Sequence, residues 1–317
     1  MLKNLSVSSS PHLRDDATTR GIMLDVCLAL LPAGLASIWF FGLRAAVLIL
    51  LSVTSAVLAE LLYQKASKQK VSVGDMSAVV TGLLLAYNLP AGAPWWVAVI
   101  GSALAIILVK QFFGGIGQNF MNPALAARAI LFVSWMSIMT RYPMAQAGNF
   151  LVGFTPDAVD TIASATPITA GSSSLWDLFL GNIPGVLGET SKAAILLGGA
   201  YLLWRRVIDW RIPFTFIATV FVCYLIQGGA EKALLQVLSG GLFLGAFFMA
   251  TDYATSPMTN LGKVIMGVGC GVLLFVIRSF STYPEGCSFA ILFMNVATPL
   301  IDKLTVPKTF GEVKQHG

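Results

Sequence analysis

Three carboxylic acids stand within or at the ends of long apolar runs of this chain: Asp25, Glu60 and Asp252. An ionised carboxylate is costly in hydrocarbon and usually faces the interior of a helix bundle, where it can bind or relay a cation. The alternative is that each acid is hydrated at the membrane interface. That alternative is stronger for Asp25 and Glu60, which stand near span ends, so Asp252 in "FFMATDYATSP" is the better candidate for an ion path.

A second polar stretch is "GGIGQNFMNPALAARA", residues 114–129. Asn122 followed by Pro123 predicts a capped helix start, and the glycines allow the backbone to approach another group closely. The free N–H groups of such a helix start can receive a phosphate or the edge of a polar ring. The alternative is a tight turn between helices with a simple cap. Arg128, one turn further on, needs a partner or a functional reason if it is buried in a membrane.

The third stretch is "DAVDTIASATPITAGSSS", residues 157–174, which is rich in hydroxyls and falls in the longest break between apolar runs. Pro167 disfavours helical geometry at Thr166 and favours an extended segment. An accessible loop of small residues is suited to entering the active site of another enzyme. From the residues alone, a solvated loop hydroxyl remains the default for every Ser and Thr here.

Several kinds of chemistry have no support in the sequence. The two histidines, His12 and His316, stand in polar tails, so no histidine-based metal cluster or Ser–His–Asp arrangement is expected. No phosphate-binding fingerprint appears in a strand–helix setting. The four cysteines form no C-x-x-C pair, and three of them lie inside apolar runs, which is typical of buried small hydrophobes. Any redox function would therefore need a bound cofactor.

The composition indicates an all-α integral membrane protein. Of its 317 residues 56% are hydrophobic and 11% charged, and the mean hydropathy is +0.78, whereas soluble domains are about 25% charged. We expect ten membrane-spanning helices, since each needs roughly 17–25 residues. They fall near 21–42, 45–64, 76–91, 94–112, 122–140, 191–204, 212–228, 233–251, 261–279 and 285–302. The third and sixth are short, as broken helices at a midplane site often are.

The distribution of Lys and Arg predicts the orientation. With the N-terminus inside, 14 of the 20 basic residues fall in inner segments, as the positive-inside rule requires. This arrangement gives a cytoplasmic tail at 1–20, a ten-span domain at 21–302 with an external loop at 141–190, and a second cytoplasmic tail at 303–317. The pI of about 9.1 then reflects this asymmetry, and we expect no nucleic-acid partner.

Two five-span halves also share a faint pattern. "SAVVTGLLLAYNLP" and "SGGLFLGAFFMATDYATSP" each precede a glycine-punctuated span that ends in a base, "GSALAIILVK" and "GVGCGVLLFVIR". Because five is odd, the two halves would have opposite orientations, which is an inverted repeat. The alternative is that both halves merely share small residues.

Taken together, four stretches resemble one family over essentially all ten spans: "GGIGQNFMNPALAARA", "SATPIT", "MATDYATSP" and "YPEGCSFAILFMNVATPLID". The chain is similar to the RnfD/NqrB family, which includes the D subunit of the Rnf ion-translocating ferredoxin:NAD⁺ oxidoreductase of bacterial membranes and the B subunit of the sodium-pumping NADH:quinone reductase. The short N-terminal tail favours the Rnf member. The resemblance implies a fold like that of urea and ammonium transporters, with an inverted repeat of five spans.

The resemblance also implies a covalent flavin mononucleotide (FMN), joined by a phosphodiester to a threonine in a motif close to D-x-x-[ST]-[GS]-A-T. Here the motif reads from Asp160 to Thr166, with Ser164 and Ala165 before the acceptor Thr166. Ala163 departs from the motif, because a hydroxyl residue is common there, and this puts recognition by the flavin transferase in some doubt. The acceptor and Asp160 remain.

A second, non-covalent flavin, riboflavin, is implied as well, and Asn119 and Asn122 are the candidate contacts. The expected function is electron transfer between ferredoxin and NAD⁺, coupled to Na⁺ or H⁺ movement, with Asp252, Glu60 and Asp25 as candidates for the ion path. The implied partners are Rnf subunits A, B, C, E and G and a flavin transferase, in the bacterial inner membrane. Two rival interpretations stay open: a cofactor-free secondary transporter or channel, and a structural scaffold.

Overall fold

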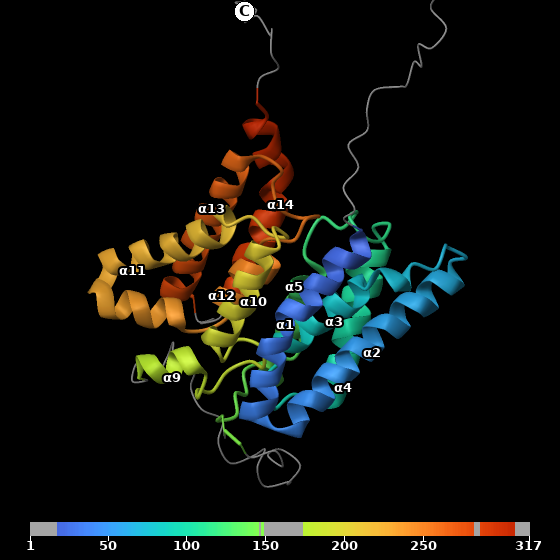
Figure 1. The fold of residues 1–317 in the computed structure, drawn as a ribbon, viewed down its shortest axis with the longest axis horizontal. Helices are drawn as coiled ribbons and strands as arrows, with labels where there is room; N and C mark the ends of the chain where they lie inside the picture. The colour runs from blue at the N-terminus through green and yellow to red at the C-terminus, as the bar shows by residue number, and fades with distance from the viewer. Residues whose placement is uncertain (1–17, 146, 149–173, 282–285, 308–317) are drawn as a thin grey trace, which may run out of the picture.

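The computed structural model describes residues 18–145, 147–148, 174–281 and 286–307 (Figure 1). All regular structure within these ranges is helical, and strand-like pairing is limited to isolated bridge residues, such as the antiparallel pair Pro90 and Val186. The all-α prediction is therefore confirmed for the described part of the chain.

Five helices are long and apolar enough to cross a membrane. They are α1 (Thr19–Phe41), α2 (Leu43–Ala66), α11 (Arg211–Leu238), α13 (Asn260–Phe280) and α14 (Cys287–Thr305). The best 18-residue windows of these helices have a mean hydropathy between 1.3 and 2.3. Because a helix rises 1.5 Å per residue, about 20 residues cross a hydrocarbon layer of about 30 Å. The protein is thus a multi-pass membrane protein.

Shorter apolar helices fill the space between the long ones. They are α3 (Ser77–Tyr87), α4 (Trp95–Ala103), α5 (Pro123–Ser134), α10 (Lys192–Trp204) and α12 (Leu242–Leu244). Two of them continue as π-helices, α4 into η2 (Leu104–Gln111) and α12 into η3 (Gly245–Met249). The remaining elements are η1 (Val73–Asp75), α6 (Met136–Met139) and α9 (Leu175–Leu180). The predicted short third and sixth spans correspond to α3 and α10.

The seventh predicted span ends at residue 228, where α11 is kinked, but the eighth predicted span differs from the structure. Helix α11 continues through Leu238, with a kink at Gly228 and at Gly229, whose φ is +82°. The chain breaks again at residues 239–241 before α12 begins. The predicted continuous span 233–251 is therefore wrong, because glycines interrupt an apolar run that composition alone cannot divide.

The helices pack in two groups. Helix α2 packs against α3 and α4, and α11 packs against α13 and, less extensively, against α12 and η3. The groups meet where α1 contacts α10 and α5 contacts α14. Gly198 permits the close approach of α10 to α1, because a Cβ added there would lie 1.9 Å from the carbonyl oxygen of Ala29.

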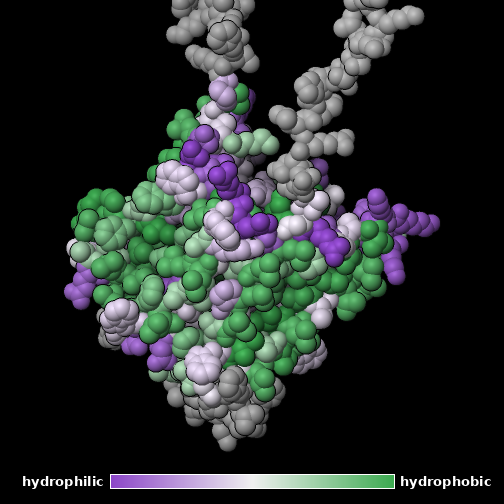
Figure 2. Space-filling view, in the orientation of Figure 1, coloured by the Kyte–Doolittle hydropathy of each residue, from purple (hydrophilic) through white to green (hydrophobic). Residues whose placement is uncertain are grey.

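The molecule has two opposite ends, which we call the terminal end and the loop end. The terminal end is where α1 begins and α14 ends, and the loop end is where α9 lies (Figure 1). Helix α1 ends at the loop end (Figure 1). There the N–H of Gly148 donates to the carbonyl of Trp39 at 3.1 Å. Hydrophobic residues cover the broad middle of the visible face, and hydrophilic residues gather toward the terminal end (Figure 2). This is the surface expected of a protein that sits in a bilayer.

Candidate functional site

One cavity brings together two of the polar stretches singled out in the sequence. We call it the Asp252 cavity. Its polar lining comes from Ser77, Thr81, Lys110, Asn119, Asn122, Thr251 and Asp252, and its apolar lining includes Phe247 and Phe248. The stretch 114–129 thus lies opposite "MATDYATSP", although more than 120 residues separate them. A cavity with aromatic walls and a few converging polar groups is the usual form of a small-molecule site.

Asn122 connects two of the segments that form the wall of this cavity, α5 and η3. Its side-chain oxygen accepts from the N–H groups of Ala124 and Leu125 at 3.1 and 3.3 Å, which caps α5 and confirms the predicted helix start. Its amide nitrogen donates to the carbonyl of Met249 at 3.4 Å, and its backbone N–H donates to the side-chain oxygen of Asn295 at 3.1 Å. The side chain of Asn122 is therefore occupied by contacts within the fold.

Asn119 and Asp252 face the same cavity from its two sides. The amide nitrogen of Asn119 donates to the carbonyl of Met121 at 3.0 Å, and Asn119 and Asp252 both line the cavity. The hydroxyl of Thr255 donates to the Asp252 carboxylate at 3.2 Å. Asp252 thus has a hydrogen-bond donor beside it but, among the described residues, no basic group within 4.0 Å.

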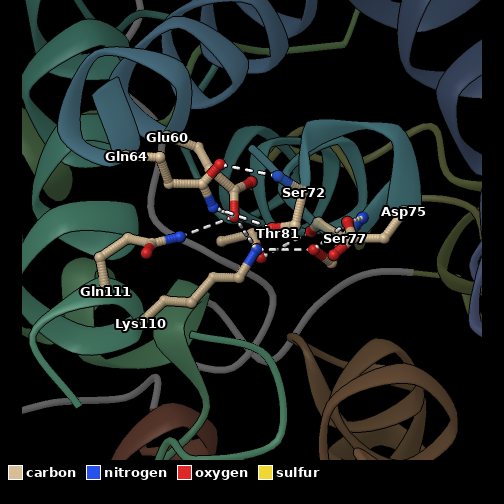
Figure 3. Close-up of polar contacts among 8 residues, drawn as sticks. All are labelled: Glu60, Gln64, Ser72, Asp75, Ser77, Thr81, Lys110 and Gln111. Atoms are coloured by element: carbon tan, nitrogen blue, oxygen red, sulfur yellow. Dashed lines mark hydrogen bonds and ion pairs between the residues drawn. The ribbon is translucent and has the colours of Figure 1, made fainter. Parts of the chain in front are cut away.

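A buried ion pair stands beside the cavity (Figure 3). Glu60 on α2 lies 2.8 Å from the ammonium of Lys110 on η2, and the exposed fractions of the two side chains are 0% and 3%. The same carboxylate oxygen accepts from Gln111 at 2.7 Å and from Gln64 at 3.3 Å. The Lys110 ammonium also donates to the hydroxyl of Ser77 at 2.6 Å. Lys110 and Ser77 both line the Asp252 cavity, so the cluster and the cavity adjoin.

Sequence reasoning missed Lys110 and Gln111 as site residues. Lys110 counted only as an inner-side charge, because its helix was expected to end there. In η2, hydrogen bonds run from residue i to i+5, as between the N–H of Phe112 and the carbonyl of Ile107 at 3.0 Å. π-Helical turns are rare and are often found at functional sites. The only signal in the sequence was the base at the end of "GSALAIILVK".

Comparison with known proteins places this architecture in a family. The model of the NQR2, RnfD, RnfE family matches residues 6–311. The chain belongs to the NQR2, RnfD, RnfE family. Relatives include the D subunit of the Na⁺-translocating ferredoxin:NAD⁺ oxidoreductase complex of Acetobacterium woodii, which is 47% identical over 98% of this chain and 96% of the relative. The D subunit of the proton-translocating complex of Clostridium ljungdahlii is 39% identical over 98% and 97%. The D subunit of an ion-translocating oxidoreductase complex of Escherichia coli is 37% identical over 97% and 99%.

In this NQR2, RnfD, RnfE family member, the third candidate acid stands apart from the other two. Asp25 accepts from the hydroxyl of Tyr201 at 2.8 Å and pairs with Arg205 at 3.1 Å, near the terminal end. It does not line the Asp252 cavity, although its neighbours Met23 and Val26 do. The structure therefore brings Asp252 and the Glu60 cluster together and leaves Asp25 in an interfacial ion pair.

Arg128 has the buried partner that its position requires. Only 5% of the residue is exposed, and its guanidinium donates to the hydroxyl of Ser288 at 2.6 Å. This contact joins α5 to α14.

Among the described residues no group of three or more metal-ligating side chains gathers.

The four residues assigned to the covalent flavin, Asp160, Ser164, Ala165 and Thr166, lie outside the described residues. The described chain on either side of them is at the loop end. The N–H of Gly148 donates a hydrogen bond to the carbonyl of Trp39 at the end of α1. The hydroxyl of Ser174 caps α9 by accepting from the N–H of Trp176 at 3.3 Å.

Proposed function

We propose that this chain is the D subunit of an ion-translocating ferredoxin:NAD⁺ oxidoreductase complex. The observation that carries the proposal is the 47% identity to the Acetobacterium woodii D subunit over 98% of this chain and 96% of that protein. Near-complete coverage of both chains argues for the same subunit rather than for a shared segment. Its partners are then Rnf subunits A, B, C, E and G, and membrane lipids surround its apolar surface.

The architecture proposed with this function is ten spans in an inverted repeat of five. The packing of α2 with α3 and α4, and of α11 with η3 and α13, supports it, and so does the one π-helix in each group. The domain bounds remain a tail at 1–20, a membrane domain at 21–302 and a tail at 303–317. Arg205, Arg206 and Lys263 follow the positive-inside rule if the terminal end faces the cytoplasm of a bacterial inner membrane.

Thr166 is the proposed attachment point of FMN, within the motif that starts at Asp160 and includes Ser164 and Ala165. A flavin accepts one or two electrons, which is the chemistry that the chain itself cannot supply. Thr166 precedes Ser174 by eight residues, and an extended chain spans at most about 3.5 Å per residue, so the two are at most about 28 Å apart. This bound supports a flavin on the external, loop end, within reach of a flavin transferase.

The Asp252 cavity is the place that we propose for the second, non-covalent flavin expected from the resemblance. Phe247 and Phe248 offer flat apolar contacts, and Asn119 and Asp252 offer polar groups for a ring edge. Asn122 is a weaker candidate contact than the sequence suggested, because both ends of its amide are engaged by α5 and Met249. Its role would be to position the chain that forms the cavity wall.

For the ion path the geometry favours Asp252 over Glu60 and Asp25. A Na⁺ ion at Glu60 would compete with the Lys110 ammonium at 2.8 Å, and one at Asp25 would compete with Arg205 at 3.1 Å. Like charges at such distances repel strongly. Asp252 accepts from Thr255, lines the cavity and has no basic group within 4.0 Å among the described residues, so it can take either Na⁺ or H⁺.

The deciding experiment is a denaturing gel of the chain after co-expression with a flavin transferase, viewed under ultraviolet light. A fluorescent band is expected for the wild type and for Thr169→Ala, and none for Thr166→Ala. Thr169 is the matched control because it is a threonine in the same loop. A wild-type band without fluorescence would favour the rival transporter or channel, and unchanged electron transfer in Thr166→Ala would favour a structural scaffold.

A further inference from the structure

We propose that the loop between α10 and α11, with the adjoining face of α11, binds one anionic phospholipid. A surface cavity at the terminal end is lined by Arg206, Asp209, Trp210, Arg211, Tyr253 and Lys263. We call it the headgroup cavity. Its three cations and one carboxylate leave a net charge of +2, which is complementary to a phosphodiester.

The charges in the headgroup cavity are ordered. Asp209 accepts from Arg211 at 2.7 Å and from Lys263 at 3.0 Å, so it fixes two cations at the rim. Arg206 is exposed, and among the described residues no carboxylate lies within 4.0 Å of it. A guanidinium presents a planar set of donors that matches phosphate geometry. Arg206 is therefore the cation most open to a ligand.

The backbone at Arg206 supports a role for its side chain. Its φ is +58°, in the left-handed region, and its N–H donates to the carbonyl of Leu203 at 3.1 Å where α10 ends. Helices usually place glycine at this position, since a side chain there is disfavoured. An arginine held in such a conformation is the kind of outlier that points to a function.

An apolar groove continues from the headgroup cavity and shares Leu203 and Trp210 with it. The groove runs along α11 past Pro213, Phe214 and Ile217 to Phe221, and its lining is almost wholly apolar. From residue 211 to residue 221 a helix rises about 15 Å, which is half of a hydrocarbon core of about 30 Å. A length of about 15 Å is that of an acyl chain in one leaflet, so the groove is long enough to hold one.

Cations above an apolar groove, with a tryptophan between them, match a lipid better than a soluble anion or a protein helix. Trp210 occupies the position that tryptophan prefers at a membrane interface. Basic residues at that level attract anionic headgroups. A soluble phosphate would leave the groove unused, and an apolar partner helix would leave Arg206 without an acidic group.

The test is native mass spectrometry of the delipidated full chain with dioleoylphosphatidylglycerol, compared with zwitterionic dioleoylphosphatidylcholine. We expect the anionic lipid to bind more tightly. Arg206→Gly should weaken it about fivefold, the effect of one cation at the surface, while the unfolding temperature stays level or rises because glycine suits this backbone. Phe214→Ser should weaken both lipids. The control Lys303→Gln removes an exposed cation of the same end and should change neither.

Five results would overturn the proposal, four of them from the binding experiment. They are equal binding of the two lipids, unchanged binding in Arg206→Gly, an equal loss in Lys303→Gln, and displacement of the lipid by glycerol 3-phosphate, which would indicate a site for a soluble anion. A partner helix cross-linked to Phe214 in the intact complex would also exclude the lipid. None of these results bears on Thr166, so this proposal and the proposed function fail separately.

Discussion

At the scale of single residues, the pair of Glu60 and Lys110 depends on mutual neutralisation, because neither side chain meets water. Replacing Lys110 by Met leaves a buried carboxylate without its cation, and we expect a loss of about 3–5 kcal/mol of stability. The double variant Glu60→Gln, Lys110→Met should recover most of it, since no uncompensated charge remains. Thermal unfolding in detergent measures both.

The exposed Lys303→Met is the matched control for that cycle, and it should change stability by less than about 0.5 kcal/mol. If Lys110→Met were as stable as the wild type, the carboxylate would have to be neutral already. The ion pair would then not be what holds η2 against α2.

Asp209 makes the stability of the terminal end dependent on pH in the acidic range. Burial alone would raise the pKa of Asp209, but hydrogen bonds from Arg211 and Lys263 outweigh it, so the pKa is lowered from 3.8. The stabilisation is present above the unfolded pKa of about 3.9 and is lost as pH falls through the lower folded pKa.

The expected result is a fall in unfolding temperature below about pH 4 that Asp209→Asn lacks, with the variant already less stable at neutral pH. Glu231→Gln, which removes an exposed carboxylate elsewhere on α11, should keep the wild-type profile. Identical profiles for Asp209→Asn and wild type would contradict the assigned hydrogen bonds.

Local chemistry was predictable at this scale, and long-range pairing was not. The cap at Asn122 follows from an Asn-Pro step whose partners are two and three residues away. The contact of Glu60 with Lys110 spans 50 residues and depends on how η2 winds. The sequence carries no signal for that winding. Glu60 and Lys110 could therefore each be recognised as charged residues in the sequence, but the ion pair between them could not be predicted.

At the scale of elements, the kink in α11 depends on Gly229. Its φ of +82° is strained for any residue with a side chain, whereas the space around it is open. Gly229→Ala should therefore cost about 1–2 kcal/mol from the backbone alone. Gly74 is the matched control, because the space around it is equally open and its backbone is outside the left-handed region.

Thermal unfolding of the two variants in the same detergent separates these effects. Gly74→Ala should be neutral or slightly stabilising, since it restricts the unfolded chain. Equal losses in both variants would indicate that φ does not govern the kink. The eighth span was mispredicted for a related reason at residues 239–241, where the chain breaks between α11 and α12: an apolar window measures composition, and backbone dihedral angles do not enter it.

At the scale of the whole molecule, the proposed orientation can be read from two engineered cysteines. Ser174→Cys at the loop end should react with a membrane-impermeant maleimide in intact spheroplasts. Lys303→Cys at the terminal end should react only after the membrane is opened. The wild-type chain, whose four cysteines are buried or half-buried, provides the background. The opposite labelling pattern would show that the protein has the inverted membrane topology, with the flavin motif on the cytoplasmic side.

At this scale the all-helical, multi-pass character of the chain was predictable from its composition. The inverted repeat of two five-span halves stays a prediction, since the helix contacts show which helices pack together and do not give the orientation of the halves. The cavity between "GGIGQN" and "MATDYATSP" was not predictable, since it arises only when two distant connections meet.

The π-helix η2 has a consequence for how relatives of this protein are aligned. In an α-helix each residue turns the chain by about 100°, and the wider turns of a π-helix take up one extra residue within Leu104–Gln111. A relative that lacks one residue there and winds as a regular α-helix would keep its lysine facing Glu60, whereas a relative of the same length without the π-turns would rotate that lysine by about 100°. Column identity at Lys110 therefore establishes a partner for Glu60 only together with the winding of this stretch.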